Sequence, residues 1–141
     1  MDAGVWVALA AAVVALAFGL HRRLTDGRAR AVQSEGEPHL VNRLGITPGQ
    51  AATFVQFSSP VCAPCRTAHR LLSDVVADDD ALAHVEVDAE SHLDLVGELG
   101  IMRTPTVLLL DADGGVRHRF VGVPRRDEVR QALAGLALPA A

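Results

Sequence analysis

Residues 52–65 read ATFVQFSSPVCAPC, and this stretch decides the class of fold. Residues 52–57 are rich in aromatic and β-branched residues and are followed by Ser58-Ser59-Pro60, which is typical of a strand that ends in a turn. From Cys65 onward the apolar residues recur at spacings of three and four, which predicts a helix. A strand that passes through a short turn into a helix indicates an α/β unit.

The chain after this unit continues to alternate between strand and helix patterns. Residues 106–110 form a continuous apolar run, as expected for a strand that is covered on both faces. The other predicted elements are strands at His39–Leu44, 83–87 and 117–121, a short helix over 93–99 that stops at Gly100, a turn at 113–115 and a helix over 126–136. The order predicts an α/β fold with a mixed β-sheet flanked by helices.

The N-terminal segment from Ala3 to Leu20 consists of 16 apolar residues and two glycines. As a helix it would extend roughly 27 Å, close to the roughly 30 Å hydrocarbon core of a bilayer. We therefore predict one N-terminal transmembrane helix, a lipid-embedded anchor over residues 3–20. The alternatives are a buried core helix and a cleaved signal peptide, although no basic residue precedes the apolar run.

The residues that follow the apolar segment bear on its orientation. Four arginines lie here: Arg22, Arg23, Arg28 and Arg30. Because basic residues beside a span tend to stay in the cytoplasm, we expect a single-pass protein of the cell membrane whose soluble part is cytoplasmic, with an extracytoplasmic domain as the alternative. Residues 21–38 lack an apolar period and are expected to form a juxtamembrane linker, which leaves residues 39–141 as the soluble domain.

The composition excludes several classes of function. The 141-residue chain has a formal net charge of -4, which offers no electrostatic reason to expect nucleic-acid binding. Two cysteines are too few for a disulfide-stapled scaffold or a four-thiolate zinc site. A zinc site would need two further ligands, and the six histidines offer none at the usual spacing, so no metal is predicted.

Cys62 and Cys65 lie where the first strong strand passes into the first strong helix. A helix N-terminus has a partial positive charge and free N–H groups, and both favour a thiolate. The three-residue spacing brings the second sulfur within reach of the first, so an intramolecular disulfide can form and break. We expect Cys62, at the exposed end, to attack, and Cys65, one turn deeper, to resolve the mixed disulfide. Inert core cysteines are the alternative.

With these motifs, residues 52–137 resemble the thioredoxin family. The motifs are Cys62-Ala63-Pro64-Cys65 after a strand, Thr104-Pro105 about 40 residues later, and Gly122. The resemblance implies a thioredoxin-like fold in which Pro105 is cis and lies against the cysteine pair, while Thr104 lends backbone groups to an extended substrate chain. It also implies protein thiol and disulfide substrates, an unidentified thiol electron donor or acceptor, and no metal or organic cofactor.

Several positions depart from the family pattern. Ser58 and Val61 replace the usual tryptophans, and Arg70 replaces the proline of the active-site helix. Gln56 stands where the family commonly has an aspartate that helps to deprotonate the resolving cysteine, and an amide cannot accept that proton.

His84 falls where the family places a lysine beside that aspartate. We hypothesise that Gln56 and His84 form a proton relay in which His84 is the substitute base for Cys65. The alternative is a strand histidine whose hydrogen bonds are satisfied locally.

The sequence thus predicts a membrane-tethered thiol–disulfide oxidoreductase. The Ala63-Pro64 dipeptide differs by one small residue from the Gly-Pro pair common in reducing members of the family, which favours the reducing direction. The alternative is a thioredoxin-like binding or scaffold module at the membrane, in which the substitutions mark degraded catalysis.

Overall fold

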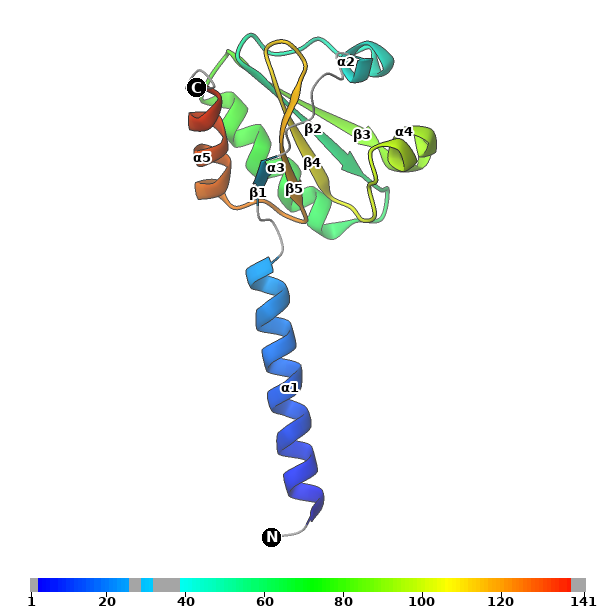
Figure 1. Ribbon diagram of the computed structural model, residues 1–141, viewed down its shortest axis with the longest axis vertical. Helices are drawn as coiled ribbons and strands as arrows, with labels where there is room; N and C mark the ends of the chain where they lie inside the picture. Colours follow the sequence, from blue (N-terminus) through cyan, green and yellow to red (C-terminus); the bar gives the residue numbers. More distant parts are fainter. Residues whose placement is uncertain (1–2, 26–28, 32–38, 138–141) are drawn as a thin grey trace.

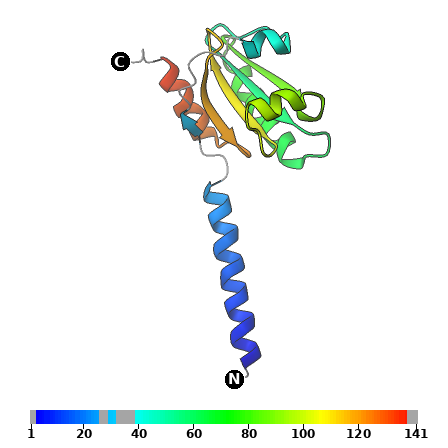
Figure 2. The ribbon, with the colours of Figure 1, turned by 45° about the vertical axis from the view of Figure 1, so that its right-hand side comes forward.

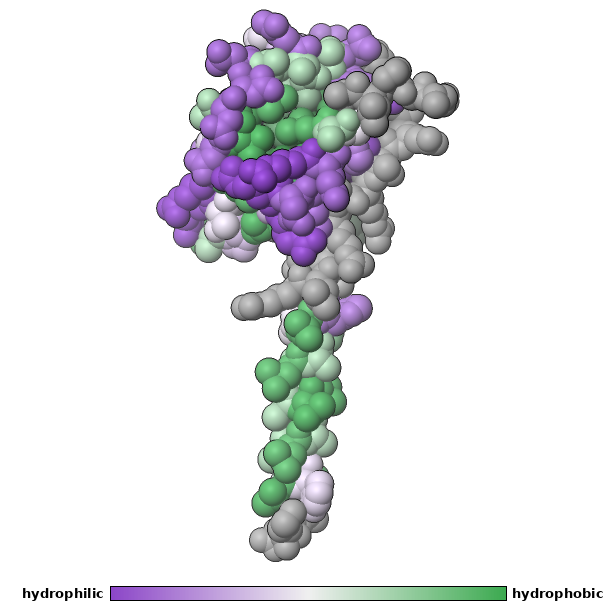
Figure 3. Space-filling view, turned by 90° about the vertical axis from the view of Figure 1, so that its left-hand side faces the viewer, coloured by the Kyte–Doolittle hydropathy of each residue, from purple (hydrophilic) through white to green (hydrophobic). Residues whose placement is uncertain are grey.

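The computed structural model describes residues 3–25, 29–31 and 39–137 (Figure 1). Helix α1, Ala3–Thr25, stands apart from the other elements, and its apolar side chains are uncovered (Figure 3). Its segment Gly4–His21 is long and apolar enough to cross a membrane, a test that a signal sequence near an N-terminus also passes. The predicted helix over residues 3–20 is confirmed, and it continues to Thr25.

The remaining elements are built around one mixed β-sheet. Its strands are β1 Ala29–Ala31, β2 Ala52–Ser58, β3 Leu82–Asp88, β4 Thr106–Asp111 and β5 Val116–Val121. The strand order is β1-β5-β4-β2-β3, with β2 and β3 parallel and the other pairs antiparallel. This arrangement confirms the mixed α/β sheet that the alternating pattern predicts.

Helices cover both faces of the sheet (Figure 2). On one face lie α3, Ala63–Ala77, and α5, Arg126–Ala137; on the other lie α2, His39–Leu44, and α4, Leu93–Glu98, which follows the 3-10 turn η1, Ala89–Ser91. Strand side chains alternate between the faces, so β2 contributes Phe54 to the core under α3 and α5 and Val55 to the opposite core. All seven residues of β2 are buried, which explains its nearly continuous apolar sequence.

The central strand β2 also determines where the functional motif lies. β2 ends at Ser58, and four residues later Cys62 caps the N-terminus of α3. The α3 side chains Ala68, Leu72 and Val75 recur at spacings of three and four and pack on the sheet. The tightly packed strand and helix therefore hold the cysteine motif between two buried elements.

Two predictions of secondary structure are wrong. Residues His39–Leu44 form helix α2 rather than a strand, because Leu40, Val41 and Leu44 have helical spacing and pack on the core that contains Val55. Within the expected linker, Ala29–Ala31 form strand β1 at the sheet edge, paired with β5 through the backbone. The described residues do not include 26–28 and 32–38 of that linker or 138–141 of the expected domain.

Candidate active site

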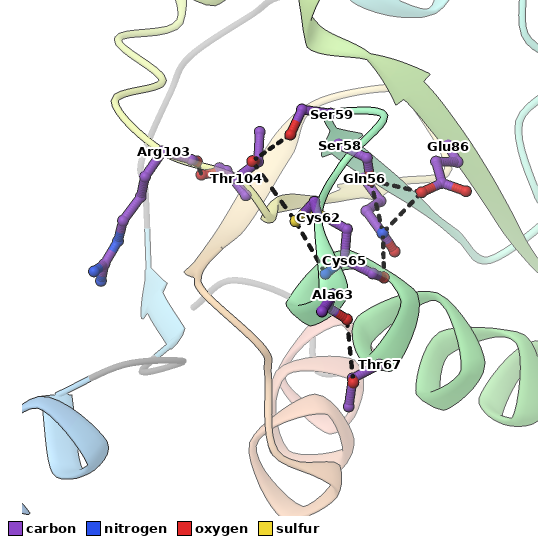
Figure 4. The surroundings of a disulfide bond; sticks show 11 residues. Gln56, Ser58, Ser59, Cys62, Ala63, Cys65, Thr67, Glu86, Arg103 and Thr104 are labelled. Atoms are coloured by element: carbon purple, nitrogen blue, oxygen red, sulfur yellow. Dashed lines mark hydrogen bonds between the residues drawn. A yellow bond between two sulfur atoms is a disulfide. The ribbon is translucent and has the colours of Figure 1, made fainter.

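The two cysteines form a disulfide at the N-terminus of α3, with an S–S distance of 2.01 Å and a Cα–Cα distance of 5.2 Å (Figure 4). Cys62 is the N-cap residue, and its Sγ accepts a hydrogen bond from the Cys65 backbone N–H at 3.2 Å. Pro64 fits the first helical turn because a backbone N–H at this position would have no acceptor within the helix. An N–H donor and the helix dipole at the Cys62 sulfur both stabilise negative charge on it.

The exposure of the two cysteines differs from the sequence prediction in degree. Cys62 is 8% exposed and Cys65 is 2% exposed, so the predicted order holds, but Cys62 is itself nearly covered. The Thr104 hydroxyl lies over Cys62 and donates toward its sulfur at 3.8 Å. Cys62, the less buried of the two cysteines, therefore lies beside the loop that carries Thr104.

That loop brings a distant part of the chain to the disulfide. The Thr104–Pro105 peptide bond is cis, as the family resemblance implies. The Thr104 hydroxyl is also 3.3 Å from the Ser59 hydroxyl, and the Gly122 N–H donates to the Pro105 carbonyl at 2.8 Å. Gly122 has a positive φ of 89°, a conformation that glycine adopts without a Cβ penalty. The β2–α3 turn, the loop before β4 and the end of β5 thus meet at one place.

Gln56 lies directly beneath the disulfide and is fully buried. Its side-chain N–H group donates to the Cys65 carbonyl at 3.0 Å, to the Ser58 hydroxyl at 2.9 Å and to the Glu86 carboxylate at 3.2 Å (Figure 4). Its oxygen is 3.2 Å from the His84 Nε2. The amide therefore joins the helix that carries Cys65 to both β2 and β3 without placing a charge in the core.

His84 lies on β3, on the same face of the sheet as Gln56. The pKa of His84 is lowered from 6.5 to about 4, chiefly by burial and in addition by the charge of His69, while Glu86 acts in the opposite direction. The rings of His84 and His69 are 5.0 Å apart. Since the Gln56 oxygen is an acceptor, a neutral His84 satisfies this contact by donating its Nε2–H. The proton-accepting role of His84 stays a prediction.

The structure adds one functional candidate that the sequence reading missed, Glu86. It is the β3 partner of Gln56 in the parallel register, and its carboxylate accepts a hydrogen bond from Ser58 at 2.6 Å. The other carboxylate oxygen is 2.9 Å from the His69 Nδ1. The signal in the sequence was the alternation of His84 and Glu86 on one face of a strand that pairs in parallel with the strand of Gln56.

A hollow of about 440 Å³ connects these groups to the solvent. Its lining consists of Ser58, Ser59, Pro60, Cys62, Cys65, Arg66, Glu86 and Asp88. Both sulfur-bearing residues and two carboxylates therefore share one water-accessible space. Within the described part of the chain, no three His, Cys, Asp or Glu side chains are grouped to hold a metal ion, and the lack of a metal or cofactor stays a prediction.

The positions that depart from the family pattern lie around this site. Val61 is 97% exposed, beside the motif, and Arg70 is exposed on α3. Ser58, in contrast, is buried and bonded to both Gln56 and Glu86. The replacement of a large aromatic residue by Ser58 therefore opens the space in which the Glu86 carboxylate reaches β2.

The protein has a mixed sheet with helices on both faces, and a disulfide lies at the start of the helix that follows β2. These features define a dithiol–disulfide protein of α/β architecture. Over residues 46–137 the chain matches the family model of the thioredoxin-like domain. This match covers more than half of the chain, and the protein therefore belongs to the thioredoxin family.

Individual relatives support this assignment over different lengths. The chain is 29% identical over 113 residues to the putative thioredoxin H10 of Arabidopsis thaliana, which covers 74% of this chain and 73% of that protein. It is 41% identical over 79 residues to NADPH-dependent thioredoxin reductase 3 of the same plant, covering 55% of this chain, but it spans only 15% of that protein's length.

Among solved structures, the thioredoxin NaTrxh from Nicotiana alata is similar, with a TM-score of 0.56 and 24% identity. The likeness covers 72% of this chain and 96% of that one, and it shows a shared fold.

Proposed function

We propose that this protein is a membrane-tethered thiol–disulfide oxidoreductase that acts on protein disulfides through Cys62 and Cys65. The observation that carries the proposal is the Cys62–Cys65 disulfide at the N-terminus of α3, bordered by an open hollow and by the Thr104–Pro105 loop. Family membership supports the same chemistry.

In the reducing direction the dithiol form acts in two steps. The Cys62 thiolate attacks one sulfur of the substrate disulfide, forms a mixed disulfide and releases the other substrate sulfur as a thiolate. The Cys65 thiolate then attacks the Cys62 sulfur, and the second substrate sulfur leaves with the electron pair of the broken bond. The substrate gains two electrons, the Cys62–Cys65 disulfide forms, and a separate thiol carrier reduces that disulfide for the next cycle.

Thr104 and Pro105 position the substrate in this proposal. Thr104 contacts both the Cys62 sulfur and Ser59, and Pro105 follows it through a cis peptide bond. A substrate chain that extends along this loop would present its disulfide to the Cys62 sulfur. Ala63 and Pro64 lie in the first turn of α3, between the two cysteines, and their similarity to the Gly-Pro pair supports the reducing direction.

The tether in this proposal is helix α1. Its uncovered apolar surface and its length suit a lipid environment, and the arginines after it support a cytoplasmic location for the soluble domain. Protease treatment of intact cells tests the location: the soluble domain is expected to stay protected until the cells are opened. Cleavage in intact cells would place the domain outside the membrane and reverse the proposed orientation.

An insulin-reduction assay with dithiothreitol as the electron source tests the activity itself. The full-length protein in detergent is expected to accelerate insulin precipitation, and the Cys62→Ser variant is expected to show only the dithiothreitol background. Equal rates for both proteins would contradict the proposed activity and favour a binding module, the alternative that the loss of the family aspartate at Gln56 supports.

A further inference from the structure

We propose that the Glu86 carboxylate is the proton acceptor for the Cys65 thiol, acting through water in the hollow that both residues line. This inference rests on the proposed exchange reaction, because it concerns the step in which Cys65 resolves the mixed disulfide. That step needs a Cys65 thiolate, and Cys65 is only 2% exposed, so a protein group that takes its proton accelerates the step.

Gln56, the side chain that contacts the Cys65 backbone, cannot accept the proton of the Cys65 thiol. Gln56 contacts the Cys65 carbonyl, but its amide has no basic site. Ser58 and Gln56 both donate to Glu86, so the two polar side chains of β2 at this site hold the carboxylate in place. Gln56 therefore links the carboxylate of Glu86 to the helix that carries Cys65.

The location of Glu86 suits the transfer of a proton between the site and the solvent. Its side chain is 39% exposed, and it lines the hollow of about 440 Å³ together with both cysteines. A space of this size, lined in part by polar side chains such as Ser58 and Ser59, admits water, which links the Cys65 sulfur to the carboxylate. A proton accepted by Glu86 can then leave to the bulk solvent without passing through the core.

Asp88 is the other carboxylate in this hollow, and its hydrogen bonds assign it a different role. One of its oxygens accepts from the Glu90 N–H at 3.0 Å and the other from the Ser91 hydroxyl at 2.6 Å, so it caps η1. These two hydrogen bonds also lower the pKa of Asp88, which makes it a weaker base. Glu86, in contrast, is bonded to Gln56, which contacts the Cys65 carbonyl.

The charged and titratable groups around Glu86 come from two elements. Helix α3 provides His69, paired with Glu86 at 2.9 Å, and Arg66, which lines the hollow. Strand β3 provides His84 and Asp88, whereas β2 contributes only neutral polar groups. His69 and Arg66 thus lie on the helix side of the carboxylate, and the neutral groups of β2 lie on its other side.

The atoms and charges balance in the proposed step. The proton of the Cys65 S–H bond moves through water to a Glu86 carboxylate oxygen, and the thiolate attacks the Cys62 sulfur of the mixed disulfide. The bond between Cys62 and the substrate sulfur breaks as the Cys62–Cys65 bond forms. The departing substrate thiolate takes up a proton from the solvent, and Glu86 releases its proton to the solvent, which restores the carboxylate.

A single-turnover reaction with 5,5′-dithiobis(2-nitrobenzoic acid) separates the two steps. The reduced full-length protein in detergent is mixed with a stoichiometric amount of the reagent, and thionitrobenzoate release is followed by absorbance. The first release reports attack by Cys62, and the second release, which does not depend on reagent concentration, reports resolution by Cys65. The Cys65→Ser variant is expected to release only the first equivalent.

Glu86→Gln is expected to leave the first release within twofold of wild type and to slow the second by about tenfold or more at pH 7, since a positioned base contributes at least this much. The difference should shrink toward pH 9, where an ordinary thiol ionises without help. Glu90→Gln, the same change at an exposed carboxylate outside the hollow, should behave as wild type. Asp88→Asn and His84→Gln test the two rival groups.

Each outcome has a separate meaning. Wild-type kinetics for Glu86→Gln at pH 7, or a comparable slowing in His84→Gln or Asp88→Asn alone, overturns the assignment of Glu86 while the exchange reaction stands. A wild-type protein that releases no second equivalent overturns the proposed exchange reaction itself. Circular dichroism checks that Glu86→Gln is folded. If it is unfolded, Glu86→Asp and Glu86→Ala replace it. Partial retention of the second rate in Glu86→Asp supports the inference, and a wild-type second rate and pH profile in Glu86→Ala overturns it.

Discussion

Replacing His84 by glutamine is expected to remove a pH-dependent part of the stability of the domain. In the folded protein the pKa of His84 is lowered from 6.5 to about 4, chiefly by burial and in addition by His69, against an opposing effect of Glu86. In the unfolded chain the ring titrates near its ordinary value. Between these two pH values the unfolded chain binds more protons than the folded protein, so acidification favours unfolding.

The magnitude follows from the size of this difference. The stability that depends on a neutral His84 is fully present above pH 6.5 and is lost as the pH falls toward 4. One pKa unit corresponds to about 1.4 kcal/mol, so the whole difference corresponds to about 3 kcal/mol. Because the ring is only partly buried, solvent screening reduces this to about 1.5 kcal/mol.

Urea unfolding of the chain without α1, at pH 7 and at pH 4.5, measures the effect. Wild type is expected to lose about 1.5 kcal/mol more than His84→Gln between the two pH values. Titrations of other groups, including His118, whose pKa is lowered by burial, are common to both proteins and cancel in the comparison. His92→Gln leaves the His84 contacts intact and should retain the wild-type pH dependence. Equal losses in wild type and His84→Gln, or an NMR titration of His84 near 6.5, would refute the reasoning.

Three further substitutions test the fold and the site. Phe54→Ala removes a fully buried ring from β2 and is expected to lower the free energy of unfolding by about 3–5 kcal/mol, measured by urea denaturation; a loss below about 1 kcal/mol would contradict the packing. Gly49→Ala would place a methyl group 2.3 Å from a backbone carbonyl oxygen of β2, so it is expected to cost about 1–3 kcal/mol, whereas Gly97→Ala, with open space around it, should cost nothing; similar melting temperatures for both would contradict this. Cys65→Ser is expected to accumulate the mixed disulfide between Cys62 and a substrate protein, visible by mass spectrometry, and its release at the wild-type rate would contradict the two-step exchange.

The elements that were predictable from the sequence are those whose burial leaves a periodic pattern. β2 and β4 are covered on both faces, and α3 is covered on one, so their apolar residues follow the strand or helix repeat. Gly100, which has a positive φ of 60°, follows the end of α4, and the sequence also predicted this end of the helix from the glycine.

The two missed elements lack such a pattern. α2 is six residues long, and over that length an apolar run fits either a strand or a helix. β1 has three residues, and its pairing with β5 depends on backbone hydrogen bonds that leave no trace in the side chains. Both elements are determined by tertiary contacts.

The cysteine pair and the loop at Thr104 were predictable because both are local motifs, whereas the polar network beneath them was only partly so. The sequence places Gln56 and His84 near each other, and the structure joins them at 3.2 Å. Glu86 was missed because its significance depends on the register between β2 and β3, which pairs it with Gln56. A strand pattern shows which residues share a face, but it does not show the register with the neighbouring strand.

The amide at position 56 and the carboxylate at position 86 are best understood as one arrangement. A carboxylate at the fully buried position of Gln56 would lose its hydration, which costs several kcal/mol unless a cation compensates, and His84 is neutral near pH 7 and supplies none. Glu86 lies on the edge strand β3, retains contact with water and has His69 as its partner. With the amide on β2 and the carboxylate on the edge strand β3, the hollow of the cysteine pair still contains a carboxylate. The buried side chain that contacts the Cys65 carbonyl is neutral, and both its nitrogen and its oxygen have polar partners. The loss of an acidic residue at position 56 is for this reason compatible with an active dithiol.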